Sequence, residues 1–225
     1  MEFETFVLAA STADLSAEPR ARACGDAVEY RLDLARDGIE SLNSYDGDLP
    51  LIVTNRVEWE GGEAPADAAR LDALETAAEH PKVGAVDIEL AAIQEGEGQR
   101  VLEYARKQGV TVIVSTHDFE ATPARETLQQ LLQTACQYGD VGKLAVTAHD
   151  RADVLDLVTV THEQTVAGNR VATMAMGEAG RHSRAVTPLY GSKIGYAPVD
   201  PADATAPGQY DLATLRSLLD QLQTG

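Results

Sequence analysis

The chain has 225 residues, of which 44% are hydrophobic, and it carries 36 Asp and Glu against 18 Lys and Arg, for a net charge of -18. This acidic balance excludes a basic nucleic-acid-binding protein, and no apolar run approaches the ~20 residues that a membrane-spanning helix needs. One substantial core suits a chain of this length, so we expect a single domain over residues 1–225, located in the cytoplasm and without a membrane partner.

Short apolar runs rich in β-branched residues alternate with helical stretches along the whole chain. The runs that predict strands occupy residues 5–11, 27–33, 50–56, 83–90, 110–116, 141–147, 171–176 and 188–192. Amphipathic patterns at 65–80, 99–108 and 127–138 predict helices between them. Pro and Gly break both patterns at 60–62 and 196–210, which predicts irregular loops there.

Residues with known capping preferences mark the helix boundaries. Thr122 followed by Pro123 predicts a helix start, as do Asp150 and Asp211. Helix ends are predicted at Gly25, Gly109 and Gly139. Eight repeats of strand and helix predict an α/β fold, a single (β/α)8 TIM barrel. A doubly wound open sheet is the alternative, although no Gly-rich phosphate loop follows any strand.

Ionisable residues on the predicted strands fall mostly near the C-terminal ends of those strands. A buried parallel strand is normally apolar throughout, so such residues are costly unless they face a site. The active site of a barrel forms at this end, from residues of several strands. The ionisable residues concerned are Glu29, Arg31, Asp33, Arg56, Asp87, Glu89 and His117.

Lys143 lies earlier, inside the apolar sixth strand, and it is one of only four lysines beside fourteen arginines. Burial lowers the pKa of an amine and raises the fraction of neutral amine that can attack a carbonyl carbon. We therefore expect Lys143 to be a nucleophile, against the alternative of a lysine that extends its amine to solvent at a sheet edge. His117 is expected to be the acid-base group beside it, and Glu60 lies close enough in sequence to Arg56 to reach the same pocket.

These residues fall in motifs that resemble those of the type I 3-dehydroquinate dehydratase family over essentially the whole chain. The motifs, in order, are E-x-R-x-D at 29–33, T-x-R at 54–56, E-G-G at 60–62, D-x-E at 87–89, S-x-H-D-F at 115–119, T-P at 122–123, G-K-L-A at 142–145, M-G-x-x-G-x-x-S-R at 176–184, Y-G-S at 190–192 and A-P-G-Q at 206–209. Each motif alone is modest evidence, whereas the ordered set is highly specific.

The resemblance implies dehydration of 3-dehydroquinate to 3-dehydroshikimate through an imine, without a metal or an organic cofactor. Lys143 would form the imine with the ring ketone, His117 would be the general acid and base, and Glu60 would orient the imidazole. Arg184 would hold the substrate carboxylate together with Gln209. The remaining substrate contacts would come from Glu29, Arg31, Arg56, Thr205, Met174 and Met176. A homodimer is expected by analogy with the family.

The chain departs from the family at two places. Thr205 stands where serine is frequent, so its contact with substrate is less secure. The first predicted strand begins almost at Met1, in place of an N-terminal hairpin that closes the lower end of the barrel in many members, so we expect that end to be less covered. Asp33, Asp87 and Glu89 match family positions, and we expect them mainly to orient Lys143 and the neighbouring arginines.

Three other functions remain open at this point. A class I aldolase would share the imine but require a different base. A divalent-metal barrel would use Glu29, Asp87, Glu89 and His117 as ligands. An inactive barrel would only bind a carboxylate or a protein partner. The acidic composition indicates a protein that works in concentrated salt, because it is typical of organisms that keep molar salt inside the cell. It therefore says little about the substrate.

Overall fold

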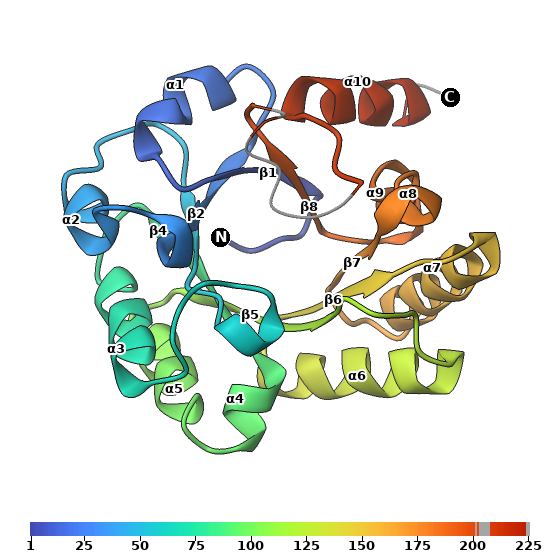
Figure 1. Cartoon of the computed structure of the whole chain (residues 1–225), viewed down its shortest axis with the longest axis horizontal. Coiled ribbons are helices and arrows are strands. Elements are labelled where there is room, and N and C mark those ends of the chain that lie inside the picture. Colours follow the sequence, from blue (N-terminus) through green and yellow to red (C-terminus); the bar gives the residue numbers. More distant parts are fainter. Residues whose placement is uncertain (201, 203–207, 224–225) are drawn as a thin grey trace.

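A computed structural model describes residues 1–200, 202 and 208–223, and in it eight parallel strands form a nearly closed barrel surrounded by helices (Figure 1). The sheet order is β7-β6-β5-β4-β3-β2-β1-β8, in which each neighbouring pair is parallel. The predicted (β/α)8 barrel is therefore confirmed, and the alternative of an open doubly wound sheet is wrong. No helix in the described ranges is long and apolar enough to cross a membrane.

The strands match the sequence pattern closely, except for the last. They are β1 (Val7–Thr12), β2 (Ala27–Arg31), β3 (Leu51–Thr54), β4 (Val83–Glu89), β5 (Thr111–Asp118), β6 (Val141–Thr147), β7 (Val171–Met176) and β8 (Ile194–Pro198). The α-helices are α1 (Glu18–Ala21), α2 (Gly38–Asn43), α3 (Ala68–Ala77), α4 (Leu90–Gln94), α5 (Gln99–Lys107), α6 (Arg125–Tyr138), α7 (Arg151–Val166), α8 (Gly177–Gly180), α9 (Ser183–Val186) and α10 (Leu212–Gln223). Short 3₁₀ helices are η1 (Leu15–Ala17), η2 (Leu32–Leu34), η3 (Glu58–Glu60) and η4 (Thr187–Tyr190).

Helix capping follows the sequence at two of the three predicted starts. Asp150 accepts hydrogen bonds from the first turn of α7 and forms a capping box with Asp153. Asp211 accepts the backbone N–H of Thr214 at the start of α10. The predicted start at Thr122 is wrong, because its hydroxyl donates to the carbonyl of Thr147 (2.9 Å) and α6 begins only at Arg125.

The barrel interior changes from apolar to polar along the strands. Inward-facing side chains of every strand form an apolar cluster that fills the lower, N-terminal end and continues upward on β6, β7 and β8. One step further up, alternation brings charged and hydroxyl side chains inward, as when Ala85 is followed by Asp87 and Val141 by Lys143. Adjacent strands are in register at this polar level, since Ser115 pairs with Lys143 and Thr54 pairs with Asp87. The floor of the site is thus built into the sheet.

The eighth strand lies later than the sequence pattern predicts. Residues 188–192 are not a strand, because Pro188 occupies the first turn of η4 and Gly191 adopts a positive φ of 109°. The barrel instead closes through β8, whose last three residues fall in the range 196–210 that the sequence predicts to be an irregular loop. Few hydrogen bonds connect β7 to the chain that leads into β8. The backbone N–H of Lys193 donates to the carbonyl of Val171 (2.7 Å), and the backbone N–H of Thr173 donates to the hydroxyl of Ser192 (3.0 Å).

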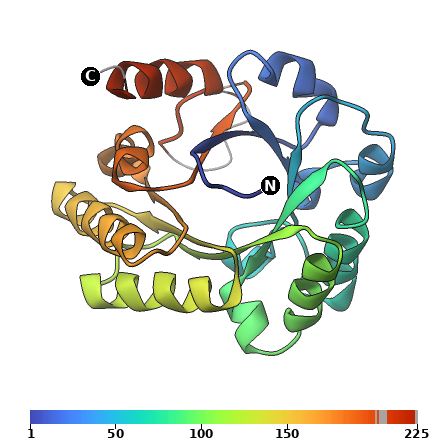
Figure 2. The same ribbon diagram turned by 180° about the vertical axis from the view of Figure 1, so that it is seen from behind.

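The lower end of the barrel is covered, contrary to the sequence expectation. The chain before β1 runs across the barrel axis, where Figures 1 and 2 place the N-terminus in the middle of the ring. Phe3 is only 2% exposed and belongs to the interior cluster. The backbone of Met1 contacts β4 and β5 through Gly84 and Thr111. The residues before β1 follow an irregular path, with Phe3 at a φ of 47°.

Candidate active site

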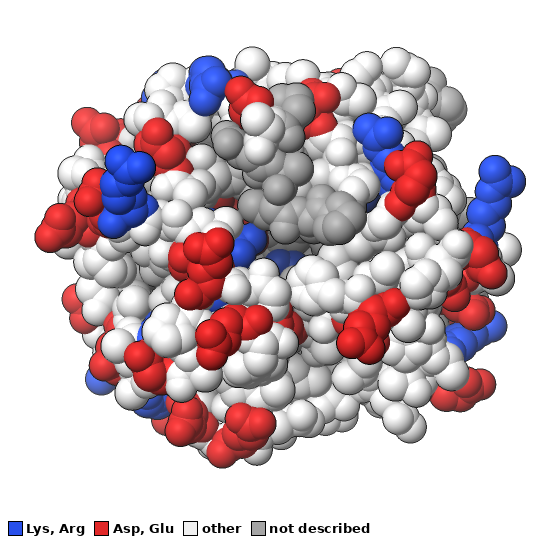
Figure 3. Space-filling view, in the orientation of Figure 1, with Lys and Arg blue, Asp and Glu red and all other residues white. Residues whose placement is uncertain are grey.

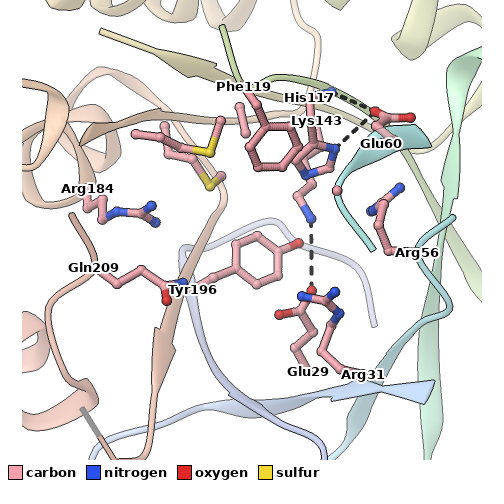
Figure 4. Close-up of a pocket in the computed structure, with 14 residues that line it drawn as sticks. Glu29, Arg31, Arg56, Glu60, His117, Phe119, Lys143, Arg184, Tyr196 and Gln209 are labelled. Carbon is pink, nitrogen blue, oxygen red and sulfur yellow. Dashed lines mark hydrogen bonds and ion pairs between the residues drawn. The ribbon is translucent and has the colours of Figure 1, made fainter. Parts of the chain in front are cut away.

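A cavity of about 490 Å³, including its mouth, opens at the C-terminal ends of the strands. Figure 3 shows acidic side chains scattered over this face and blue basic groups inside its hollow. Figure 4 shows side chains from opposite sides of the barrel pointing into the cavity. Its lining is Glu29, Arg31, Arg56, Glu60, Gly61, His117, Phe119, Lys143, Ala145, Met174, Met176, Arg184, Tyr196 and Gln209.

Lys143 points into the cavity from the middle of β6 and is 4% exposed. Its amine lies 2.8 Å from the Asp87 carboxylate and 4.0 Å from that of Glu29. Glu29 is itself held by two hydroxyl donors, Ser11 (2.6 Å) and Thr54 (3.0 Å). The ring of Tyr196 lies 4.2 Å from the same amine. The amine is therefore fixed within the barrel, with one face toward the cavity.

Arg56 lies just above Asp87 and links the floor of the cavity to its wall. Its guanidinium donates to Asp87, to Glu89 (2.8 Å) and to the Ser115 hydroxyl (2.8 Å). Glu89 is completed on its other side by Arg70 of α3 (2.8 Å). Arg56 and Lys143 together hold the pKa of Asp87 far below its usual range, despite burial that opposes this. Asp87 is thus a permanent anion beneath the amine.

His117 and Glu60 form a pair at the mouth of the cavity. A single Glu60 oxygen accepts the backbone N–H of His117 (2.6 Å) and lies 3.0 Å from its Nδ1. Burial, followed by the charges of Arg56 and Lys143, lowers the pKa of His117 well below its ordinary value. Burial raises the pKa of Glu60 to about 8, although Arg56 opposes the shift. The imidazole is therefore neutral at physiological pH, as a general base must be.

Arg184 projects into the cavity from α9 and is 4% exposed. In the described ranges no carboxylate pairs with it, and its Nε has no hydrogen-bond partner. Burial alone lowers its pKa to about 10, so the group remains charged at neutral pH. A buried cation without a counter-ion is costly in a folded protein. The arrangement leaves a place for an anionic group of a ligand.

The other predicted contacts line the same cavity, with one outside the described residues. Arg31 lines the cavity while it is held by Asp33 through two bonds of 2.9 and 2.6 Å. Gln209 reaches the cavity beside Arg184, as Figure 4 shows. Met174 and Met176 supply an apolar wall from β7. Thr205 lies outside the described residues.

Close contact between two glycines fixes the turn that carries Gln209. A Cβ on Gly208, whose φ is 76°, would lie only 2.4 Å from the carbonyl oxygen of Gly177. The guanidinium of Arg181 stacks on the ring of Tyr210 at 4.2 Å. The segments after β7 and β8 are therefore held together on either side of Gln209.

Several side chains at the site were not predicted from the sequence. Tyr196 on β8 and Phe119, whose ring stacks on that of His117 at 6.0 Å, both line the cavity. Arg70 and Ser115 complete the ion pairs around Arg56. Phe119 belongs to the S-x-H-D-F motif and could have been chosen from it, whereas nothing in the sequence distinguishes Arg70 from other helix arginines.

The geometry also bears on the alternative of a divalent-metal site. Asp87 and Glu89 are engaged by Lys143 and the arginines, and Glu29 by two hydroxyls. Among the described residues, no three His, Cys, Asp or Glu side chains are grouped to hold an ion. The donor set that the alternative requires is already engaged in ion pairs and hydrogen bonds within the protein.

Comparison with known proteins identifies the family. A family model described as type I 3-dehydroquinase matches residues 6–225. The chain is 60% identical over 228 residues to the 3-dehydroquinate dehydratase of Haloarcula marismortui, spanning 100% of this chain and 99% of that protein. It is 53% identical over 226 residues to that of Halobacterium salinarum, spanning 99% and 100%. Both organisms are halophiles, which supports the salt-adapted source that the composition predicts.

Solved structures give the same result. The 3-dehydroquinate dehydratase of Geobacillus kaustophilus superposes with a TM-score of 0.88 at 29% identity, covering 98% of this chain and 92% of that chain. The type I enzyme of Clostridium difficile, with covalently modified comenic acid, gives 0.87 at 28% identity, covering 98% and 93%. With the family model and the curated relatives spanning nearly every residue, the chain belongs to the type I 3-dehydroquinase family of hydro-lyases.

Proposed function

We propose that this protein dehydrates 3-dehydroquinate to 3-dehydroshikimate, in the shikimate pathway, through an imine on Lys143. The observation that carries the proposal is the meeting, in one cavity, of a buried amine, a neutral imidazole and a guanidinium that no carboxylate of the described residues pairs. The substrate offers a partner for each of them: a ring ketone, an acidic C–H next to it and a carboxylate.

The reaction divides into steps that the two groups share. The Lys143 nitrogen adds to the ketone carbon, and the ketone oxygen leaves as water to give the iminium. The iminium withdraws electrons, so the proton on the adjacent carbon becomes acidic and His117 removes it. The electron pair then expels the hydroxyl one carbon further on, which takes a proton from the His117 imidazolium and departs as water. Hydrolysis of the imine releases the product and restores Lys143.

Glu60 determines which nitrogen of His117 faces the substrate. Its Oε1 already accepts the His117 backbone N–H, so Nδ1–H donates most simply to the same oxygen. This tautomer leaves the lone pair of Nε2 free for the cavity, where a base is needed. Phe119, stacked on the imidazole, holds the ring plane in place.

Substrate orientation follows from the charges on the cavity wall. Arg184 binds the carboxylate through its guanidinium fork, with Gln209 beside it. The carboxylate and the departing hydroxyl share one carbon, so this contact also places the hydroxyl. Glu29, Arg31 and Arg56 contact the ring hydroxyls, and Met174 and Met176 contact the apolar side of the ring. The covalently modified ligand in the C. difficile structure supports covalent chemistry in a relative.

Borohydride trapping tests the imine directly. We expect incubation with 3-dehydroquinate and borohydride to leave a reduced adduct on the Lys143 peptide, detected by mass spectrometry. Lys143→Ala should give no adduct and no measurable turnover, whereas Lys193→Ala is the matched control, because Lys193 bonds the carbonyl of Glu4 at the opposite end of the barrel. Turnover by Lys143→Ala at the unmutated rate would refute the mechanism.

His117→Ala separates imine formation from proton transfer. Adducts should still form slowly, while turnover falls by ~100-fold or more, the usual scale for loss of general acid-base catalysis. The homodimer and the cytoplasmic location stay predictions, which light scattering and cell fractionation would check.

A further inference from the structure

Tyr196 has a buried hydroxyl that none of the described residues satisfies. The residue lies in the middle of β8, faces the barrel interior and is 4% exposed. In the part of the chain that the structure describes, its hydroxyl has no hydrogen-bond partner. Buried hydroxyls are normally paired, so this one points to a partner other than the described residues.

The position of Tyr196 relative to Lys143 indicates where that partner binds. The Lys143 amine lies 4.2 Å from the centre of the Tyr196 ring. Figure 4 shows the hydroxyl end of the ring directed toward the Lys143 amine and Glu29. A ketone carbon that comes within bonding distance of the amine therefore brings its oxygen close to the hydroxyl.

The surroundings keep Tyr196 a hydrogen-bond donor. Burial, followed by the negative charges of Asp87 and Glu29, raises the pKa of its phenol well above the ordinary value. The phenol is thus protonated throughout the physiological range and cannot replace His117 as a base. The centre of its ring lies 4.2 Å from the Lys143 nitrogen, a distance at which an aromatic face attracts a cation.

We propose that Tyr196 is a catalytic residue that donates a hydrogen bond to the substrate oxygen on the carbon that Lys143 attacks, while its ring face stabilises the iminium. This inference rests on the proposed function. As the N–C bond forms, the π pair of the C=O bond moves to oxygen, and the phenol stabilises the developing charge without giving up its proton. The protons that later release this oxygen as water come through His117.

Tyr196→Phe isolates the hydroxyl, because the ring remains. We expect the rate of adduct formation, followed by rapid mixing with 3-dehydroquinate and borohydride quenching, to fall by ~10- to 100-fold, the range for one lost hydrogen bond to a charged group. The unfolding temperature of the free protein should stay the same or rise, because an unsatisfied buried hydroxyl has been removed. Tyr196→Leu should lower the rate further by removing the ring.

Tyr45→Phe is the matched control. Tyr45 is a buried tyrosine between α2 and β3, remote from the cavity, and its hydroxyl donates to the carbonyl of Leu49 (2.7 Å). Its removal should lower the unfolding temperature and leave the trapping rate unchanged. Tyr45→Phe should therefore change only the unfolding temperature, downward. Tyr196→Phe should slow adduct formation without lowering the unfolding temperature.

The outcomes separate this inference from the proposed function. If the unmutated protein gives no Lys143 adduct, the proposed function fails. If it gives the adduct and Tyr196→Phe forms it at the same rate with the same kcat/KM, only the role of Tyr196 is overturned. A clear fall in the unfolding temperature of Tyr196→Phe would also overturn it, since the hydroxyl would then bond within the protein.

Discussion

The guanidinium of Arg184 is buried without a carboxylate among the described residues. Its charge should therefore destabilise the free protein while it favours the proposed binding of the substrate. We expect Arg184→Met to raise the unfolding temperature, because a similar-sized apolar group replaces an uncompensated charge. The same change should raise KM about 100-fold, the scale of a lost buried charge pair of ~3 kcal/mol. Steady-state kinetics and thermal unfolding measure the two effects.

Arg184→Lys is the matched variant, since it retains the charge without the planar fork. It should bind substrate between the unmutated protein and Arg184→Met. An unchanged KM in Arg184→Met would exclude the carboxylate contact.

The Glu60 carboxyl couples stability to pH. Its pKa in the folded protein is raised to about 8, so the stability that its proton contributes is complete below pH ~4.5 and is lost as the pH rises through 8. His117, with a lowered pKa, acts in the opposite direction but only below pH ~6.5. Between pH 6.5 and 8 the unmutated protein should therefore lose stability, and Glu60→Gln should not. Urea unfolding at several pH values checks this, and equal slopes would contradict it.

The site residues divide into those with a signature in the sequence and those without. Lys143 and His117 could be chosen because an ionisable side chain on an apolar strand requires an explanation. Tyr196 could not, because it begins the range 196–210 that the sequence predicts to be a loop, and because an aromatic residue on a strand is equally typical of a hydrophobic core. Arg70 acts across the sheet from α3, and only the packing of that helix brings it to Glu89.

At the scale of elements, the segment before β1 closes the lower end of the barrel. Phe3 fills the interior there, so Phe3→Ala should lower the free energy of unfolding by about 3 kcal/mol, the range for a buried aromatic that leaves a cavity. The active site lies at the other end, so kcat/KM for 3-dehydroquinate should hardly change. Denaturant titration and kinetics test both. Phe119→Ala is the contrast, since it should lower activity more than stability.

Strand prediction succeeded where the pattern had one interpretation. The strands β6 and β7 match their predicted ranges because each is a mainly apolar run of six or seven residues. The strand β8 was missed because its Gly and Pro are typical of loops, while Pro-Leu-Tyr before it has the composition of a strand. Gly195 is tolerated because Phe6 packs where its Cβ would lie. Such compensation is a property of the fold and not of the local sequence.

At the scale of the whole molecule, the net charge of -18 makes stability depend on salt. Raising KCl from 0.1 to 1 M shortens the screening length from ~10 to ~3 Å, so repulsion between exposed carboxylates weakens. We expect the unfolding temperature to rise over this range. Replacing exposed Glu95, Glu97 and Glu103 by Gln should make the rise shallower, and an identical salt dependence would show that repulsion is not its cause.

Few backbone hydrogen bonds join β7 to β8, so the barrel is closed weakly at this one place. Arg184 follows β7 and Tyr196 belongs to β8. A ligand that contacts both residues would therefore link the two strands from inside the barrel. Occupancy should then slow the exchange of the Lys193 backbone N–H with deuterium, which borohydride-trapped protein would show most clearly. The contacts that bind the substrate would thus also stabilise the closure of the barrel between β7 and β8.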